Sequence, residues 1–215
     1  MAFIFDLDGT LLDSMGIWAS AGSNYLLSRG IIPEKGLDEK FKTFTLKEVV
    51  AYYRKVYHLS ESGETLMDSV NDFIEKEYRE NAPPKKGVKG FLETYHGEKM
   101  CIATATDRHL VEISLKIHGM SQYFSEIFTC TEVGVGKTKP DIYEIALAHL
   151  GTEKEDTIVF EDAVHGIISA KKAGFPVIAV ADQSALTDKE EILQYADLYI
   201  ESFDTEFLEE WKNKR

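Results

Sequence analysis

The hydrophobic residues of the chain fall into short unbroken runs that alternate with longer segments of helical period. The short runs have the length of buried strands, and they lie at 2–5, 100–103, 127–130, 157–160 and 176–180, with a further run at 198–200. Helical periodicity appears between them, at 109–118, 141–150 and 166–173. Strands that alternate with helices in this way predict an α/β fold, a doubly wound parallel sheet covered by helices on both faces.

The segment that follows the first run has a different pattern. It contains no strand-like run, and its apolar residues recur with helical spacing at 17–27, 46–57 and 66–78. A Pro83-Pro84 pair then interrupts the helical pattern and marks the return to alternating strands and helices. We therefore expect a small all-helical domain at 14–81, inserted after the first strand, and a core formed by 1–13 and 82–215.

Acidic side chains follow two of the predicted strands at their carboxyl ends. Asp6 and Asp8 come directly after the first run, and Glu161 and Asp162 follow the run at 157–160. The carboxyl ends of parallel strands meet at one edge of a sheet, so these carboxylates would share one crevice. Like charges this close disfavour ionisation unless a cation lies between them, and Mg²⁺ prefers such oxygen ligands. The chain has no His or Cys cluster with zinc-ligand spacing, which makes the softer metals poorer candidates.

Four short motifs follow predicted strands in order along the chain. They are Asp6-Leu7-Asp8-Gly9-Thr10, Thr104 after the second strand, Lys137 in the stretch Gly136-Lys137-Thr138-Lys139-Pro140-Asp141, and Glu161-Asp162. Together they resemble the motifs of the haloacid dehalogenase-like phosphohydrolases, and the resemblance covers essentially the whole chain. It implies a Rossmann-like core with a helical cap, to which the insert at 14–81 corresponds. Thr138 replaces the usual proline, so the choice of Lys137 over Lys139 rests on motif register alone.

The resemblance also implies a role for each motif residue. Asp6 would be the nucleophile that accepts the phosphoryl group. Asp8 would bind the metal through its backbone carbonyl, while its side chain would serve as general acid and then as general base. The phosphate would be bound by Thr104, Ala105 and Lys137, and the metal site would be formed by Asp6, Asp8, Glu161 and Asp162. Dehalogenating relatives lack a carboxylate at the position of Asp8, so its presence favours phosphate esters as substrates.

These roles predict a magnesium-dependent phosphatase that hydrolyses a small phosphate monoester through an aspartyl-phosphate intermediate. A sugar phosphomutase of the beta-phosphoglucomutase type stays open, because it shares all four motifs. In those relatives a cap arginine grips the substrate phosphate, whereas the comparable stretch at 43–48 contains no arginine. A non-catalytic binder of phosphate ligands is the second alternative. The sequence does not identify the substrate, because cap side chains such as Trp18, Lys47 and Arg54 cannot be oriented from periodicity.

Composition narrows the range of partners. The chain has 24 basic and 37 acidic residues, and its formal net charge of −13 opposes binding to nucleic acid or to an anionic membrane. A small phosphorylated metabolite needs only a local positive charge. No apolar run approaches the roughly 18 residues of a membrane span, and the first run is too short for a signal peptide. Cys101 and Cys130 lie in predicted strands, as expected for buried free thiols. We therefore expect a monomeric cytoplasmic enzyme.

Overall fold

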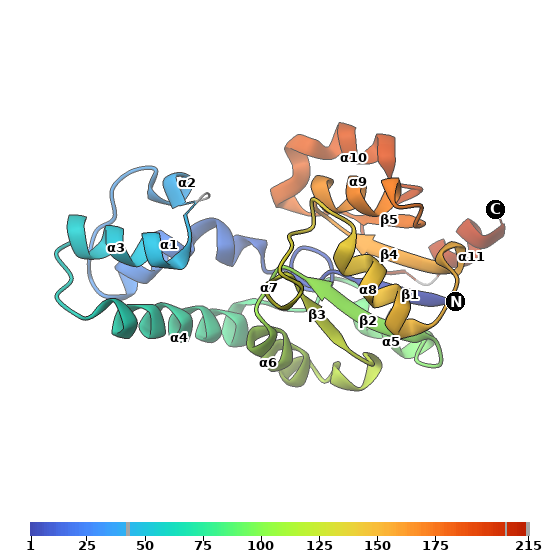
Figure 1. Ribbon diagram of the computed structural model, residues 1–215, viewed down its shortest axis with the longest axis horizontal. Helices are drawn as coiled ribbons and strands as arrows, with labels where there is room; N and C mark the ends of the chain where they lie inside the picture. The colour runs from blue at the N-terminus through green and yellow to red at the C-terminus, as the bar shows by residue number, and fades with distance from the viewer. Residues whose placement is uncertain (42–43, 205, 214–215) are drawn as a thin grey trace. The chain divides into compact units, whose positions relative to one another are not determined.

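The core of the protein is a six-stranded sheet in which every pair of neighbouring strands is parallel. The computed structural model describes residues 1–41, 44–204 and 206–213. The strand order is β3-β2-β1-β4-β5-β6, with bounds β1 (Ala2–Phe5), β2 (Lys99–Thr104), β3 (Ile127–Thr129), β4 (Thr157–Glu161), β5 (Val177–Val180) and β6 (Leu198–Ile200). The first strand lies in the middle, and successive strands extend the sheet outward in both directions (Figure 1). This topology confirms the predicted doubly wound α/β fold.

Helices cover the two faces of this sheet. Those of the core are α5 (Val88–Thr94), α6 (Arg108–His118), α7 (Cys130–Val133), α8 (Asp141–Leu150), α9 (Val164–Lys172), α10 (Lys189–Tyr195) and α11 (Glu206–Asn213). On one face, α8, α9 and α10 contribute apolar side chains to a buried cluster with Ile4 and Val159 of the central strands. On the other face, alternate residues of the same strands form an aromatic cluster, in which Phe5 stacks on Phe160 with ring centroids 4.7 Å apart. Both faces of the central strands are therefore buried, which explains their unbroken apolar sequence.

The structure corrects the prediction for one of the two cysteines. Cys101 is fully buried in β2, as expected. Cys130, by contrast, begins the short helix α7 and is only partly buried. The hydroxyl of Thr129 accepts a hydrogen bond from the backbone N–H of Glu132, and this N-cap ends the strand one residue earlier than the apolar run indicates.

The residues Gly16–Asn81 form a second compact unit, and Met1–Met15 with Ala82–Arg215 form the first. The helices of this part are α1 (Met15–Ser28), α2 (Leu37–Phe41), α3 (Leu46–Val56) and α4 (Gly63–Asn81), of which the short α2 has no counterpart among the predicted segments. Tyr25 of α1 and Tyr53 of α3 are buried and stacked, with ring centroids 5.4 Å apart. Thr45 and Glu48 form a capping box at the start of α3. These two residues belong to the stretch at 43–48 that lacks an arginine, and Thr43 lies outside the described residues.

The two segments that connect the core to this insert run side by side within the first unit. The backbone N–H of Asp13 donates to the carbonyl of Pro83 at 2.9 Å, and that of Lys85 donates to the carbonyl of Leu11 at 2.9 Å. The Lys85 ammonium also lies 2.8 Å from a carboxylate oxygen of Asp182, in the loop after β5. The point at which the chain leaves and re-enters the core is thus fixed by backbone and side-chain contacts. In the described part of the chain, no helix combines the length and apolar character needed to cross a membrane.

Candidate active site

The loop after β1 places two aspartates at the carboxyl edge of the sheet. The backbone N–H of Asp6 donates to the carbonyl of Phe160 at 3.0 Å, so the pairing with β4 continues one residue past the strand. Leu7 is fully buried, and its carbonyl accepts the backbone N–H groups of Leu11 and Leu12, which closes a tight loop. Asp6 and Asp8 are each buried, with 7% of the residue exposed. Both carboxylates are therefore largely shielded from solvent, and backbone hydrogen bonds hold the loop that carries them.

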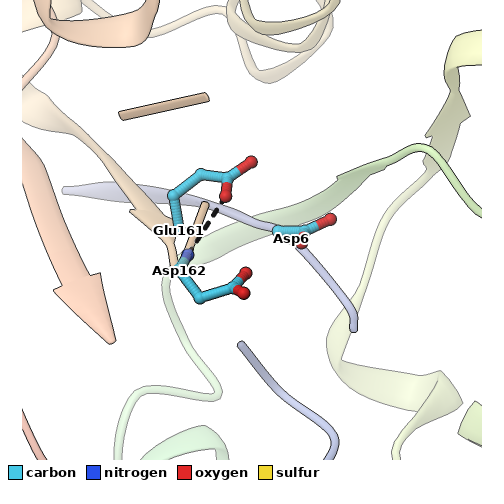
Figure 2. Close-up of side chains that lie close together, drawn as sticks. All are labelled: Asp6, Glu161 and Asp162. Atoms are coloured by element: carbon cyan, nitrogen blue, oxygen red, sulfur yellow. Dashed lines mark hydrogen bonds between the residues drawn. The ribbon is translucent and has the colours of Figure 1, made fainter. Parts of the chain in front are cut away.

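Three carboxylates converge at this edge. Asp6, Glu161 and Asp162 each offer an oxygen within 4.8 Å of the other two. Figure 2 shows these three side chains close together. The ammonium of Lys137 lies 2.5 Å from Oδ1 of Asp6 and 2.5 Å from Oε1 of Glu161. Lys137 is 5% exposed, whereas the side chain of Lys139 is exposed at the surface. The structure thus brings Lys137 into direct contact with two of the acidic residues predicted from the motifs.

Glu161 differs from the other two carboxylates in its hydrogen bonds. Its Oε1 accepts from the ammonium of Lys137 at 2.5 Å and from the hydroxyl of Tyr143 at 2.9 Å. Its Oε2 accepts from its neighbours' backbone N–H groups, Asp162 at 3.0 Å (Figure 2) and Ala163 at 3.1 Å. Asp162 accepts a hydrogen bond from the hydroxyl of Thr10 at 3.1 Å, and its side chain is almost fully buried. Both oxygens of Glu161 are therefore used within the protein.

Burial dominates the protonation of the cluster. Desolvation raises the pKa of Asp6 to about 7, against the opposing effect of the neighbouring Lys137 ammonium. Desolvation also raises the pKa of Asp162 well above its ordinary value, and the charge of Glu161 adds to this effect. Burial lowers the pKa of Lys137, but the carboxylates of Asp6 and Glu161 outweigh burial and raise it above its ordinary value. The single ammonium does not offset the desolvation of Asp6 and Asp162, so a further cation at the cluster would stabilise the charged forms of these two side chains.

Asp8 has hydroxyl partners that its sequence context did not reveal. Its two carboxylate oxygens accept hydrogen bonds from Ser14 and from Thr106. Thr106 also donates its backbone N–H to the hydroxyl oxygen of Thr104 at 3.2 Å, and both threonines are buried. Ala105, between them, is exposed. The only sequence signal for Thr106 was its position two residues after Thr104, because residues two apart in an extended chain point to the same side.

Gly9 allows the loop to approach Asp162 closely. Its φ is +77°, and a Cβ at this position would lie 2.2 Å from Oδ2 of Asp162. Gly134 offers a matched comparison because it has the same φ of +77° with no atom within 4 Å of a built Cβ. Gly134→Ala should therefore lower the free energy of unfolding by about 1–2 kcal/mol, which is only the cost of placing an alanine in the left-handed region. Gly9→Ala should lower the free energy of unfolding by about 1–3 kcal/mol more than Gly134→Ala, because Asp162 must also move. Urea unfolding of both variants measures the difference, and equal losses would contradict the close packing at Gly9.

Comparison with known proteins gives this cluster a family context. The family model described as haloacid dehalogenase-like hydrolase matches residues 3–180, a range that contains all four motifs. Hexitol phosphatase A of Escherichia coli is 30% identical over 202 residues, which cover 89% of this chain and 89% of the relative. The phosphorylated carbohydrates phosphatase of Thermotoga maritima is 26% identical over 175 residues, covering 80% and 81% of the two chains.

Solved structures resemble the whole fold. A crystal structure from Thermotoga maritima, provisionally named a beta-phosphoglucomutase, has a TM-score of 0.82 and 25% identity, and covers 97% of this chain and 98% of its own. The family match spans the sheet strands from β1 to β5 and includes Asp6, Lys137 and the Glu161-Asp162 pair. It confirms the resemblance found in the motifs and the prediction of a hydrolase. The clustered acids, the buried lysine and this match lead to one conclusion, that the chain belongs to the haloacid dehalogenase-like hydrolase family.

Proposed function

We propose that this protein is a magnesium-dependent phosphatase that hydrolyses a small phosphate monoester through an aspartyl phosphate on Asp6. The observation that carries the proposal is the position of the Asp6 carboxylate. It contacts the Lys137 ammonium at 2.5 Å and has oxygens of Glu161 and Asp162 within 4.8 Å. A carboxylate nucleophile, an ammonium and further acids in one place suit phosphoryl transfer, in which positioning and charge neutralisation do most of the work.

The donor set fits a hard divalent cation. Asp6 and Asp162 are buried carboxylates whose pKa values are raised by desolvation, and a bound cation would favour their charged forms. We assign the metal to these two side chains and to the backbone carbonyl of Asp8. Glu161 was also predicted as a ligand, but its oxygens already accept four hydrogen bonds, so we propose that it serves mainly to hold Lys137. When bound, Mg²⁺ would supply charge neutralisation for the phosphate oxygens.

The remaining steps use side chains of the chain itself. An oxygen of Asp6 attacks phosphorus, and the bond from phosphorus to the ester oxygen breaks. Lys137, the Thr104 hydroxyl and the backbone N–H of Ala105 hold the phosphoryl oxygens during this transfer. Asp8, held by the hydroxyls of Ser14 and Thr106, donates a proton to the leaving alcohol. It then accepts a proton from the water that attacks the aspartyl phosphate, which releases inorganic phosphate and restores Asp6.

The helical insert would act as the cap of this enzyme. Lid domains on paired connections can exclude bulk water and complete a site when substrate binds. The hydrogen-bonded pair of connecting segments, at 11–13 and 83–85, would anchor such a motion on the side of the core. The substrate would be a small phosphorylated metabolite, and the monomeric state, the cytoplasmic location and the absence of nucleic-acid or membrane partners stay predictions from the sequence.

A panel of phosphorylated metabolites tests the proposal directly. Hexitol phosphates and hexose phosphates come first, because the relatives described above are named for phosphorylated carbohydrates. We expect Mg²⁺-dependent release of inorganic phosphate from at least one small ester.

A sugar phosphomutase is the second candidate. It is supported by the similar structure from Thermotoga maritima, with a TM-score of 0.82, that carries the beta-phosphoglucomutase name. Conversion of a hexose 1-phosphate to its 6-phosphate, with little free phosphate, would favour the mutase. Binding without any turnover would leave only the non-catalytic binder.

A further inference from the structure

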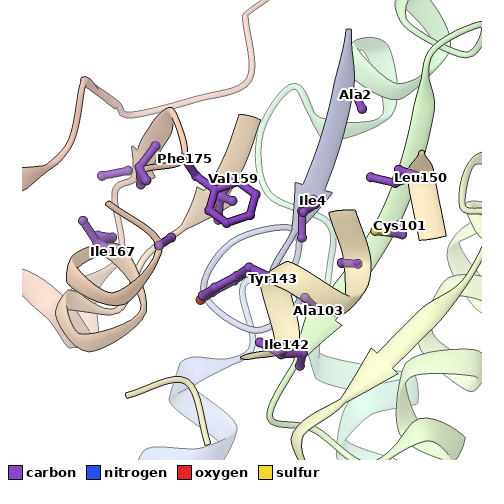
Figure 3. Packing of buried hydrophobic residues seen from close by; sticks show 14 of the residues in the cluster. Ala2, Ile4, Cys101, Ala103, Ile142, Tyr143, Leu150, Val159, Ile167 and Phe175 are labelled. Carbon is purple, nitrogen blue, oxygen red and sulfur yellow. The ribbon is translucent and has the colours of Figure 1, made fainter. Parts of the chain in front are cut away.

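Tyr143 is a buried polar group that the reaction proposed above does not use. It lies on α8, is fully buried, and belongs to the apolar cluster that packs this helix on the sheet (Figure 3). Its ring lies near that of Phe175, with centroids 6.3 Å apart. The hydroxyl at the end of this ring donates to Oε1 of Glu161 at 2.9 Å. Sequence alone gave no signal for this contact, because an aromatic residue on the apolar face of a helix is usually only part of the core.

The hydroxyl of Tyr143 is one end of a continuous chain of polar contacts. Oε1 of Glu161 accepts from Tyr143 and from the Lys137 ammonium, and that ammonium also contacts Oδ1 of Asp6. The second oxygen of Glu161 is held by two backbone N–H groups, so the carboxylate is fixed at both ends. The direction of the Lys137 side chain therefore depends on a carboxylate whose orientation Tyr143 helps to set.

Gly166 leaves the space that this arrangement needs. A Cβ at Gly166 would lie 2.5 Å from Oε1 of Glu161 and 2.9 Å from the hydroxyl of Tyr143. Gly166 lies inside α9, where glycine is a poor helix former, and its φ is not in the left-handed region. The space occupied by the Glu161 carboxylate and the Tyr143 hydroxyl is thus the physical reason for a glycine here.

We propose that Tyr143 is a positioning residue, which acts through Glu161 to hold the Lys137 ammonium against Asp6. The inference rests on the proposed function, in which Lys137 neutralises charge on the transferring phosphoryl group. Without the hydroxyl, Oε1 of Glu161 keeps only one of its two partners, and the carboxylate can rotate together with the ammonium bound to it. A small misplacement of a charge-stabilising group is costly to the rate even when substrate still binds.

Tyr143→Phe removes the hydroxyl and keeps the ring in the core. We expect kcat to fall about 10-fold while KM stays within about twofold, because the ammonium is misdirected and the rest of the site is retained. Tyr53→Phe is the matched control, since Tyr53 is also fully buried and its hydroxyl donates to the carbonyl of Gly22 at 2.8 Å in the insert. This control should lose a comparable amount of thermal stability and keep its kcat. An unchanged kcat in Tyr143→Phe would overturn the proposal.

A double-mutant cycle separates a positioning role from a merely structural one. If Tyr143 acts through Glu161, Tyr143→Phe should lower kcat about 10-fold in the native background and less than twofold in a Glu161→Gln background. Full additivity of the two losses would contradict the mechanism and show that Tyr143 affects the rate by another route.

The third measurement does not depend on turnover. The ¹⁵N resonance of the Lys137 ammonium, assigned by its loss in Lys137→Met, should be visible in the native protein because the buried group is held by two carboxylates. Tyr143→Phe should broaden or shift this resonance, and Tyr53→Phe should not. If the native protein released no phosphate from any ester, the proposed function would fail, but this resonance would still decide whether Tyr143 orders Lys137. A resonance unaffected by Tyr143→Phe would overturn the inference alone.

Discussion

Asp6→Asn should abolish phosphate release, with a loss on the order of 10⁴-fold or more in kcat. The amide is a poor nucleophile and cannot form the aspartyl phosphate on which the proposed mechanism depends. The same change removes the carboxylate that contacts the Lys137 ammonium at 2.5 Å. Steady-state phosphate release under saturating Mg²⁺, on the best ester of the metabolite panel, measures the loss. A variant that retained a tenth of the native rate would rule out Asp6 as nucleophile.

The fold should survive this substitution. Burial disfavours the charged form of Asp6 and raises its pKa to about 7, so a neutral amide of the same shape suits the site. Lys137 keeps its contact with Glu161 at 2.5 Å. Thermal unfolding of Asp6→Asn should therefore lie close to that of the native protein. Asp156→Asn is the matched control, because it makes the same chemical change at an exposed carboxylate of the core outside the loop that leads to the insert, and it should leave both activity and unfolding unchanged.

Removal of divalent metal should have the second largest effect. After dialysis against EDTA, we expect activity to fall below about a hundredth of its value, since loss of a charge-stabilising group typically costs 10²–10³-fold or more. Added MgCl₂ should restore it, and EDTA saturated with Mg²⁺ beforehand should have no effect. The physical reason is the excess of buried carboxylates over ammonium groups at the site. Full activity in the metal-free protein would contradict the assignment of Asp6 and Asp162 as ligands.

Metal removal should also give the stability of the protein a pH dependence that can be measured without substrate. In the metal-free protein, burial raises the pKa of Asp6 from its ordinary value of 3.8 to about 7. The protonated form is therefore favoured by folding, and this stabilisation is complete below pH 3.8 and lost as the pH rises through 7. Mg²⁺ binds the charged form, so it should raise Tm more at pH 8 than at pH 6. In Asp6→Asn, the Mg²⁺-induced increase in Tm should differ less between pH 8 and pH 6. If the difference between the two pH values stayed the same, it would come from groups other than Asp6.

The short apolar runs and the residues that follow them were enough to predict much of the core. Strands buried on both faces must be apolar at every position, and this requirement leaves a visible pattern at 2–5 and 157–160. The carboxylates at the ends of these strands could be assigned to one site, because strands of a parallel sheet end at a common edge. The resemblance to a known family then depended on local residues, and the family match over residues 3–180 confirms it.

Hydrogen bonds between segments distant in the sequence could not be predicted in the same way. Two such hydrogen bonds join Tyr143 to Glu161 and Thr106 to Asp8. In each pair, the residues around one partner do not indicate which residue the other partner is. The strand boundary at Cys130 also went against the apolar pattern, because a cap at Thr129 starts a helix there. The sequence by itself determined the order of strands and helices and the acids at the strand ends, since periodicity and motif spacing are local properties. Only the tertiary structure decided which lysine contacts Asp6 and which groups contact that lysine. Those contacts depend on how α8, α9 and the loop after α7 pack against the sheet.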